Sequence, residues 1–178
     1  MAIAGGARRR PSGRIVCVGT RERGDDGVGP LVADEIRHTY PDVDVRECRD
    51  SFDLLDVIGD AGTVVVVDAA RDVVDAARVV GGGAGSPPVP GTVHIVADLQ
   101  QAQMSLGLSS THGFGPSEVL ALAGSVGGAQ ATVTLVAVVG ESFDIGADVS
   151  DAVIAAVPAA AEQAVRLLGQ GRDIVGEP

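Results

Sequence analysis

The run TVVVVD at residues 63–68 constrains the fold more than any other part of the chain. It places four consecutive β-branched, apolar valines directly before a turn-forming aspartate. A strand with one solvated face alternates apolar and polar residues, so a continuous apolar run indicates a strand that is covered on both faces. Such strands are typical of parallel sheets with helices on each side. The run therefore predicts an α/β protein.

The segments on either side of this run alternate between strand-like and helix-like spacing of apolar residues. Their order predicts a three-layer sandwich, in which helices cover both faces of a mostly parallel central sheet of about five strands. The expected strands are Arg14–Gly19, Val43–Cys48, Thr63–Asp68, Thr92–Ala97 and Thr132–Val139. The expected helices are Asp26–Thr39, Phe52–Ile58 capped by Asp50 or Ser51, Pro116 to about Ala123, and a last helix capped by Ser150, kinked at Pro158 and running through Leu168.

A length of 178 residues fits one domain with a single core. We expect this domain at residues 14–170, with a disordered leader at 1–13 and a flexible tail at 171–178. Within it, residues 81–91 read as a Gly/Pro-rich loop and residues 98–113 as a mobile flap. Three consecutive arginines near the start lack the apolar run of a signal peptide, and we expect no stretch to be long enough to span a membrane. These patterns predict a cytoplasmic protein.

The composition excludes several classes of function. The net charge of −11 argues against nucleic acid as a partner, and 2% aromatic residues argues against stacking on bases. The chain has no lysine, because all 13 of its cationic residues are arginines, so a mechanism that requires lysine is excluded. Cys17 and Cys48 lie in separate apolar runs, where we expect small buried side chains and neither a disulfide nor a metal site.

Three acids follow strands that should be neighbours in the sheet. Asp25 and Asp26 come just after the first strand, and Asp68 ends the third. Ligands of open parallel sheets bind beyond the carboxyl ends of the strands, so these acids should converge there. Taken singly, Asp25 or Asp26 could cap a helix and Asp68 could form a turn. Two converging carboxylates repel each other, however, so the crevice requires a metal, a shared proton or a cation.

A histidine supplies a third candidate ligand. His112 lies in the loop STHGFG after the fourth strand, at the same expected edge of the sheet. The other two histidines have simpler roles, since His38 lies near the end of the first helix and His94 lies inside a strand. Two carboxylates and one imidazole suit a divalent metal such as nickel or zinc. The residues alone thus predict a metal-dependent site and leave its substrate open.

Four short motifs along the chain resemble those of a known protein family. They are CVGTRERGDDGVG at 17–29, VVVVDAA at 64–70, PGTVHIV at 90–96 and STHGFG at 110–115. Together with the closing strand and helix, this ordered set resembles the hydrogenase maturation proteases from about Arg14 to Leu168. Each motif is weak by itself, whereas the set in its order and spacing is fairly specific.

The resemblance implies an endopeptidase that removes the C-terminal extension of a nickel-loaded [NiFe] hydrogenase large-subunit precursor. It implies that Asp26, Asp68 and His112 are the metal-binding and catalytic residues. The metal would be nickel supplied by the substrate, with zinc or cadmium as a substitute, and it would polarise the scissile carbonyl or activate a water. The implied partner is that precursor, with no role for nucleic acid or a membrane.

The first loop departs from the family pattern. Cys17 replaces a glycine, Thr20 replaces an asparagine, and Arg21 and Glu22 replace apolar residues. None of these changes removes a predicted ligand. Arg21 or Arg23 is also expected to pair with Asp25, in a structural role.

Other classes on similar scaffolds fit less well. A response-regulator receiver needs a lysine near its last strand, and the chain has none. A dinucleotide-binding module needs G-x-G-x-x-G after the first strand, and a flavodoxin usually offers aromatic rings to its flavin. Two alternatives stay open, namely a generic metal-dependent hydrolase with its own tightly held metal and a non-catalytic chaperone of the precursor.

Overall fold

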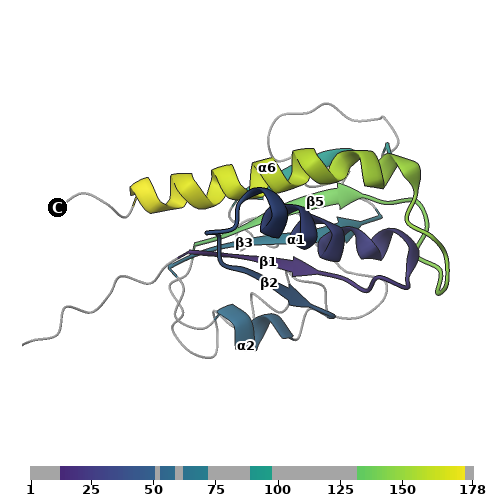
Figure 1. Ribbon diagram of the computed structural model, residues 1–178, viewed down its shortest axis with the longest axis horizontal. Helices are drawn as coiled ribbons and strands as arrows, with labels where there is room; N and C mark the ends of the chain where they lie inside the picture. The colour runs from purple at the N-terminus through teal and green to yellow at the C-terminus, as the bar shows by residue number, and fades with distance from the viewer. Residues whose placement is uncertain (1–12, 51–52, 59–61, 72–88, 98–131, 175–178) are drawn as a thin grey trace, which may run out of the picture.

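The computed structural model describes residues 13–50, 53–58, 62–71, 89–97 and 132–174. They form a five-stranded sheet with the strand order β2-β1-β3-β5-β4 (Figure 1). The expected helix at 116–123 and most of the two expected loops lie outside the described residues. The strands are β1 (Arg14–Val18), β2 (Val45–Cys48), β3 (Thr63–Ala70), β4 (Val93–Ala97) and β5 (Thr132–Val139).

The predicted three-layer fold with a mostly parallel sheet is confirmed. β1 pairs in parallel with β2 and β3, and β3 pairs in parallel with β5. Among the five described strands, β4 alone is antiparallel, against β5. The four valines of β3 are fully buried, because both of its neighbours are strands and helices cover both faces. Burying each valine contributes about 1.5–3 kcal/mol, so this strand anchors the core.

Helices α1 (Val28–Thr39) and α6 (Asp151–Ile174) cover one face of the sheet, and the short helix α2 (Leu54–Ile58) lies against the other (Figure 1). Alternate residues of the strands separate into two cores. Ile15, Cys17, Val65 and Val67 pack with α1 and α6. The residues between them pack on the α2 side with Leu54, as the alternation of a strand requires.

The two cysteines behave as expected. Cys17 and Cys48 are both free and buried, one in each core. Burial first, and then nearby carboxylates, raise the pKa of both thiols, that of Cys48 to about 11. Both side chains therefore stay neutral and serve as small apolar residues.

Helix α6 differs from its prediction in two ways. It continues past Leu168 to Ile174. By length and apolar composition alone, Asp151–Gln170 could cross a membrane, so the expectation that no stretch is long enough was wrong. The apolar character has another cause, because Val153, Val157, Ala160, Ala164 and Leu168 pack into the core against the sheet and α1. Pro158 lies on its exposed side, inside the helix.

Candidate active site

The carboxyl ends of β1 and β3 meet at one edge of the sheet, as the sequence predicts. Cys17 is the register partner of Val67, so β1 ends level with the position where Asp68 stands in β3. Asp26 follows β1 in a short 3-10 helix, Gly24–Gly27, which leads directly into α1. The two acids therefore reach this edge from the ends of neighbouring strands.

Asp26 is partly exposed and held from one side. One of its carboxylate oxygens, Oδ2, accepts a 2.7 Å hydrogen bond from the backbone N–H of Thr20. The chain before Thr20 must turn sharply, and Gly19 has a φ of +140°. A Cβ at Gly19 would lie 1.9 Å from the carbonyl oxygen of Asp26, so only glycine allows this approach. The other carboxylate oxygen of Asp26 accepts no hydrogen bond from the described residues.

Asp68 is partly buried and close to Asp26. Burial and then the negative charge of Asp26 raise the pKa of the Asp68 carboxyl to about 8. A hydrogen bond of 2.9 Å from the backbone N–H of Ala69 to Oδ1 opposes this shift without cancelling it. The structure thus brings the two predicted acids within electrostatic range of each other. Two carboxylates in this position are stabilised by a bound cation.

The third predicted ligand, His112, lies outside the described residues. Within the described part of the chain, no three histidine, cysteine or acidic side chains gather as a metal site would require. Asp26 and Asp68 each keep one carboxylate oxygen free of hydrogen bonds from the described residues. Two carboxylate oxygens can supply part of the ligands of a nickel or zinc ion. Because His112 lies outside the described residues, the metal site with three ligands stays a prediction.

Asp25 has a structural role that the sequence did not reveal. Its side chain is 0% exposed and accepts three backbone N–H hydrogen bonds, from Glu141, Ser142 and Ser150. Burial alone would raise the pKa of this carboxyl, but the N–H donors outweigh it and hold the pKa below its usual value. In return, the N–H of Asp25 donates to the carbonyl of Ser142. We call this arrangement the Asp25 socket; it joins the loop after β1 to the loop between β5 and α6.

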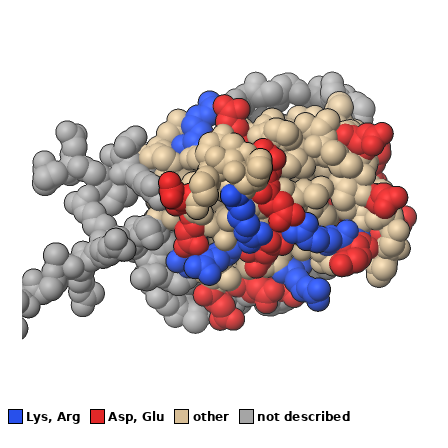
Figure 2. Space-filling view, in the orientation of Figure 1, with Lys and Arg blue, Asp and Glu red and all other residues tan. Residues whose placement is uncertain are grey.

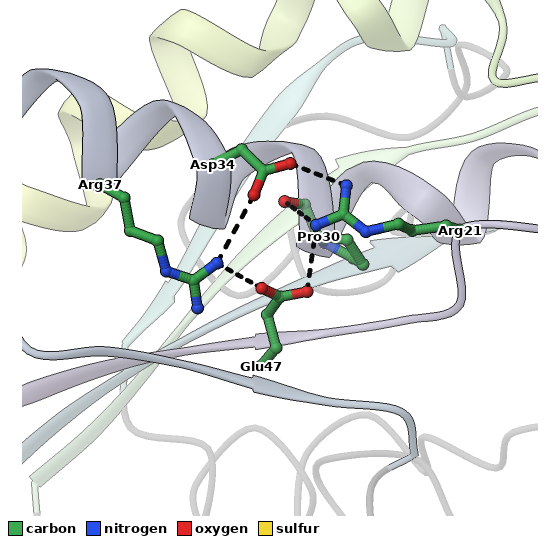
Figure 3. A network of polar contacts seen from close by, with 5 residues as sticks. All are labelled: Arg21, Pro30, Asp34, Arg37 and Glu47. Carbon is green, nitrogen blue, oxygen red and sulfur yellow. Dashed lines mark hydrogen bonds and ion pairs between the residues drawn. The ribbon is translucent and has the colours of Figure 1, made fainter.

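The expected pairing of Arg21 or Arg23 with Asp25 is wrong. The side chain of Arg21 instead contacts Asp34 of α1 at 2.7 Å and Glu47 of β2 at 3.2 Å. Arg37 contacts the same two acids, so the four side chains form a closed network of ion pairs (Figure 3). Asp25 needs no arginine, because three N–H donors already satisfy its charge.

This network ties the first loop to its surroundings. Arg21 also donates to the carbonyl of Pro30, so one side chain joins the loop to α1 and β2. Figure 2 shows positive and negative side chains interspersed on this face of the molecule, below a largely uncharged area. Exposed ion pairs contribute about 0–1 kcal/mol each, so the network orients the loop more than it stabilises the fold.

Solved structures with the same architecture are hydrogenase maturation endopeptidases. HybD from E. coli is 22% identical, with a TM-score of 0.67 over 89% of this chain and 93% of that one. The [NiFe] hydrogenase maturation protease HybD from Thermococcus kodakarensis is 21% identical, with a TM-score of 0.66 over 88% and 99%. The hydrogenase 2 maturation peptidase from a Thaumarchaeota archaeon is 26% identical, with a TM-score of 0.57 over 89% and 98%.

These likenesses confirm the resemblance that the motifs indicated, and with it the fold. No protein-family model matches the chain, and no curated protein matches it in sequence. The shared architecture extends over nearly the whole length of each of these three structures.

Proposed function

We propose that this protein is an endopeptidase that removes the C-terminal extension of a nickel-loaded [NiFe] hydrogenase large-subunit precursor. The acidic pair, Asp26 and Asp68, carries the proposal, because it stands at the carboxyl edge of β1 and β3 on the fold of maturation endopeptidases. That edge is where ligands bind in open α/β sheets. The reaction is expected to take place in the cytoplasm.

In this proposal the substrate carries the metal to the enzyme. The free carboxylate oxygens of Asp26 and Asp68, together with His112, would bind nickel that the precursor already holds. Zinc or cadmium could take its place, because both accept oxygen and nitrogen ligands. The metal would supply Lewis-acid activation of the scissile carbonyl or of a water. Asp26 itself is oriented for this role by the N–H of Thr20.

The test is the intact mass of the nickel-loaded precursor from the same genome, measured before and after mixing with this protein. We expect the loss of a C-terminal peptide from nickel-loaded precursor and no loss from nickel-free precursor. Asp26→Asn should slow the cleavage about a hundredfold or more, because it removes a ligand charge. The matched control is Asp148→Asn, since Asp148 is an exposed acid without a hydrogen bond to the described residues, and it should cleave normally.

Three outcomes would contradict the proposal or a part of it. An unchanged mass of verified nickel-loaded precursor, together with stable binding to it, would favour the precursor chaperone. Tight metal binding by the protein alone, with cleavage independent of the precursor's nickel, would favour the generic hydrolase. Unchanged cleavage by Asp26→Asn would remove this acid from the mechanism.

A further inference from the structure

Two arginines meet at one phenylalanine beside the acidic pair. The Nε–H of Arg23, in the loop after β1, donates to the carbonyl of Phe143 at 3.4 Å. The guanidinium of Arg71, just after β3, lies over the ring of the same residue, with its carbon 4.4 Å from the ring centroid. Phe143 belongs to the loop between β5 and α6. Both guanidiniums are therefore held at fixed places by contacts that leave their positive charge uncompensated.

Neither arginine has an acidic partner in the described part of the chain. Arg14, Arg21, Arg37 and Arg46 all form ion pairs with aspartates or glutamates. Arg23 and Arg71 form none with described residues, and both are exposed. A single exposed arginine without an acidic partner is common on protein surfaces. Two such arginines that contact the same residue beside a candidate active site are uncommon, and they suggest a binding site.

The contacts of Arg23 and Arg71 leave guanidinium N–H donors free to bind a carboxylate. A guanidinium stacked on a ring keeps the N–H donors along its edge, and these match the two oxygens of a carboxylate. Arg23 uses only its Nε–H, so both of its terminal nitrogens stay available. The pair can thus donate several charge-assisted hydrogen bonds to a single anionic group.

The position of the pair links it to the substrate. The backbone carbonyl of Arg23 accepts a 3.3 Å hydrogen bond from the N–H of Asp26. Arg71 directly follows β3, three residues after Asp68. We propose that Arg23 and Arg71 form, around Phe143, a binding site for one carboxylate group of the protein substrate. This inference rests on the proposed function for the identity of its ligand as a peptide.

The surrounding charges limit what the site accepts. Glu22, Glu141 and Asp144 are exposed and lie on the same two loops. They repel a second or third negative charge, so the site selects a single carboxylate and disfavours a polyanion such as nucleic acid. A side-chain or terminal carboxylate of a peptide fits this restriction.

The direct test is an NMR titration of the intact protein, following the arginine Nε–H and backbone N–H signals. The probe is the amide of N-acetylglutamate, and its neutral counterpart is the amide of N-acetylglutamine. We expect the signals of Arg23, Arg71 and Phe143 to shift with the glutamate probe only, with a dissociation constant on the order of 10 mM. Arg71→Gln and Arg23→Gln should each weaken binding about tenfold, because each removes a charged hydrogen-bond donor.

Arg166→Gln is the matched control. Arg166 is exposed and has no ion pair with described residues, but it lies in the second half of α6. It should bind the probe as the unaltered protein does, and circular dichroism should show every variant folded. The proposal would be overturned by equal shifts with both probes or by no shift at saturating probe. It would also be overturned if Arg23→Gln and Arg71→Gln both bound the probe with unchanged affinity.

A kinetic measurement separates this inference from the proposed function. With cleavable precursor, Arg71→Gln should raise KM about tenfold and leave kcat nearly unchanged, because it removes a substrate contact away from the reacting bond. An equal loss in kcat would contradict a binding role. If the unaltered protein cleaves no precursor, the proposed function fails, while the titration still decides whether the carboxylate site exists.

Discussion

Asp25 and Asp26 are neighbours in sequence and opposites in their surroundings. The carboxylate of Asp25 is fully buried in its socket, where three backbone N–H groups donate to it. The carboxylate of Asp26 is partly exposed, accepts one N–H, and faces the charge of Asp68. The native structure holds the pKa of Asp25 low and raises that of Asp68. The socket stabilises the ionised form of Asp25, whereas burial and the charge of Asp26 disfavour a second negative charge on Asp68.

The difference shows how the site loop is held in place. The socket joins the loop after β1 to the loop between β5 and α6. The Arg21 network joins the same loop to α1 and β2 (Figure 3). Between these two attachments, Asp26 and Asp68 are left with free oxygens and unfavourable repulsion. The socket thus holds in place the loop that carries Asp26.

The largest effect should come from breaking the socket. Asp25→Asn should lower the free energy of unfolding by about 3 kcal/mol, because an amide turns N–H donors toward N–H groups and leaves them buried without acceptors. Because the chain has no tryptophan, far-ultraviolet circular dichroism in urea is the suitable measurement. A loss below that of the exposed control Asp148→Asn would show that the socket does not hold the loop.

The pH dependence sharpens this prediction. The pKa of Asp25 is lowered from its ordinary value of 3.8, so its stabilising contribution is present above that pH. The contribution is lost as the pH falls through the native pKa. The difference between the unaltered protein and Asp25→Asn should therefore be full at pH 7 and shrink in acid.

A smaller effect of opposite sign is expected at Asp68. Its native pKa, about 8, lies above the ordinary 3.8, so ionised Asp68 destabilises the metal-free protein. Asp68→Asn should stabilise by about 1–2 kcal/mol above pH 8, allowing for solvent screening of a partly buried group. The gain should shrink as the pH falls toward 4. Urea unfolding at pH 5 and pH 9 measures it, and a loss of stability at pH 9 would show that the two acids do not repel each other.

Local patterns in the sequence were sufficient to predict most of the fold. The valine run predicted a strand covered on both faces, and β3 is buried between β1 and β5. The antiparallel direction of β4 was not predicted, since residue spacing within a strand is the same in both directions. The last helix was expected to end at Leu168, but α6 continues to Ile174, because glycines weaken a helix without ending it.

The candidate site was predicted in part, for a physical reason. Asp26 and Asp68 were found because strand ends in a parallel sheet meet at one edge. The socket was missed because the partners of Asp25 are backbone N–H groups more than a hundred residues later, which no side-chain pattern reveals. The arrangement of Arg23 and Arg71 was missed for the same reason, because both contact Phe143, which lies far from them in sequence.

The smallest stability effect should be at Asp26. Asp26→Asn keeps an oxygen for the N–H of Thr20 and relieves repulsion with Asp68, so these changes nearly cancel. We expect the free energy of unfolding to change by about 0.5 kcal/mol or less, as for an ordinary surface substitution. Urea unfolding beside Asp25→Asn makes the comparison direct, because the same amide change is made one residue apart. A loss of stability as large as that of Asp25→Asn would mean that both acids stabilise the loop. The assignment of a structural role to Asp25 alone would then be wrong.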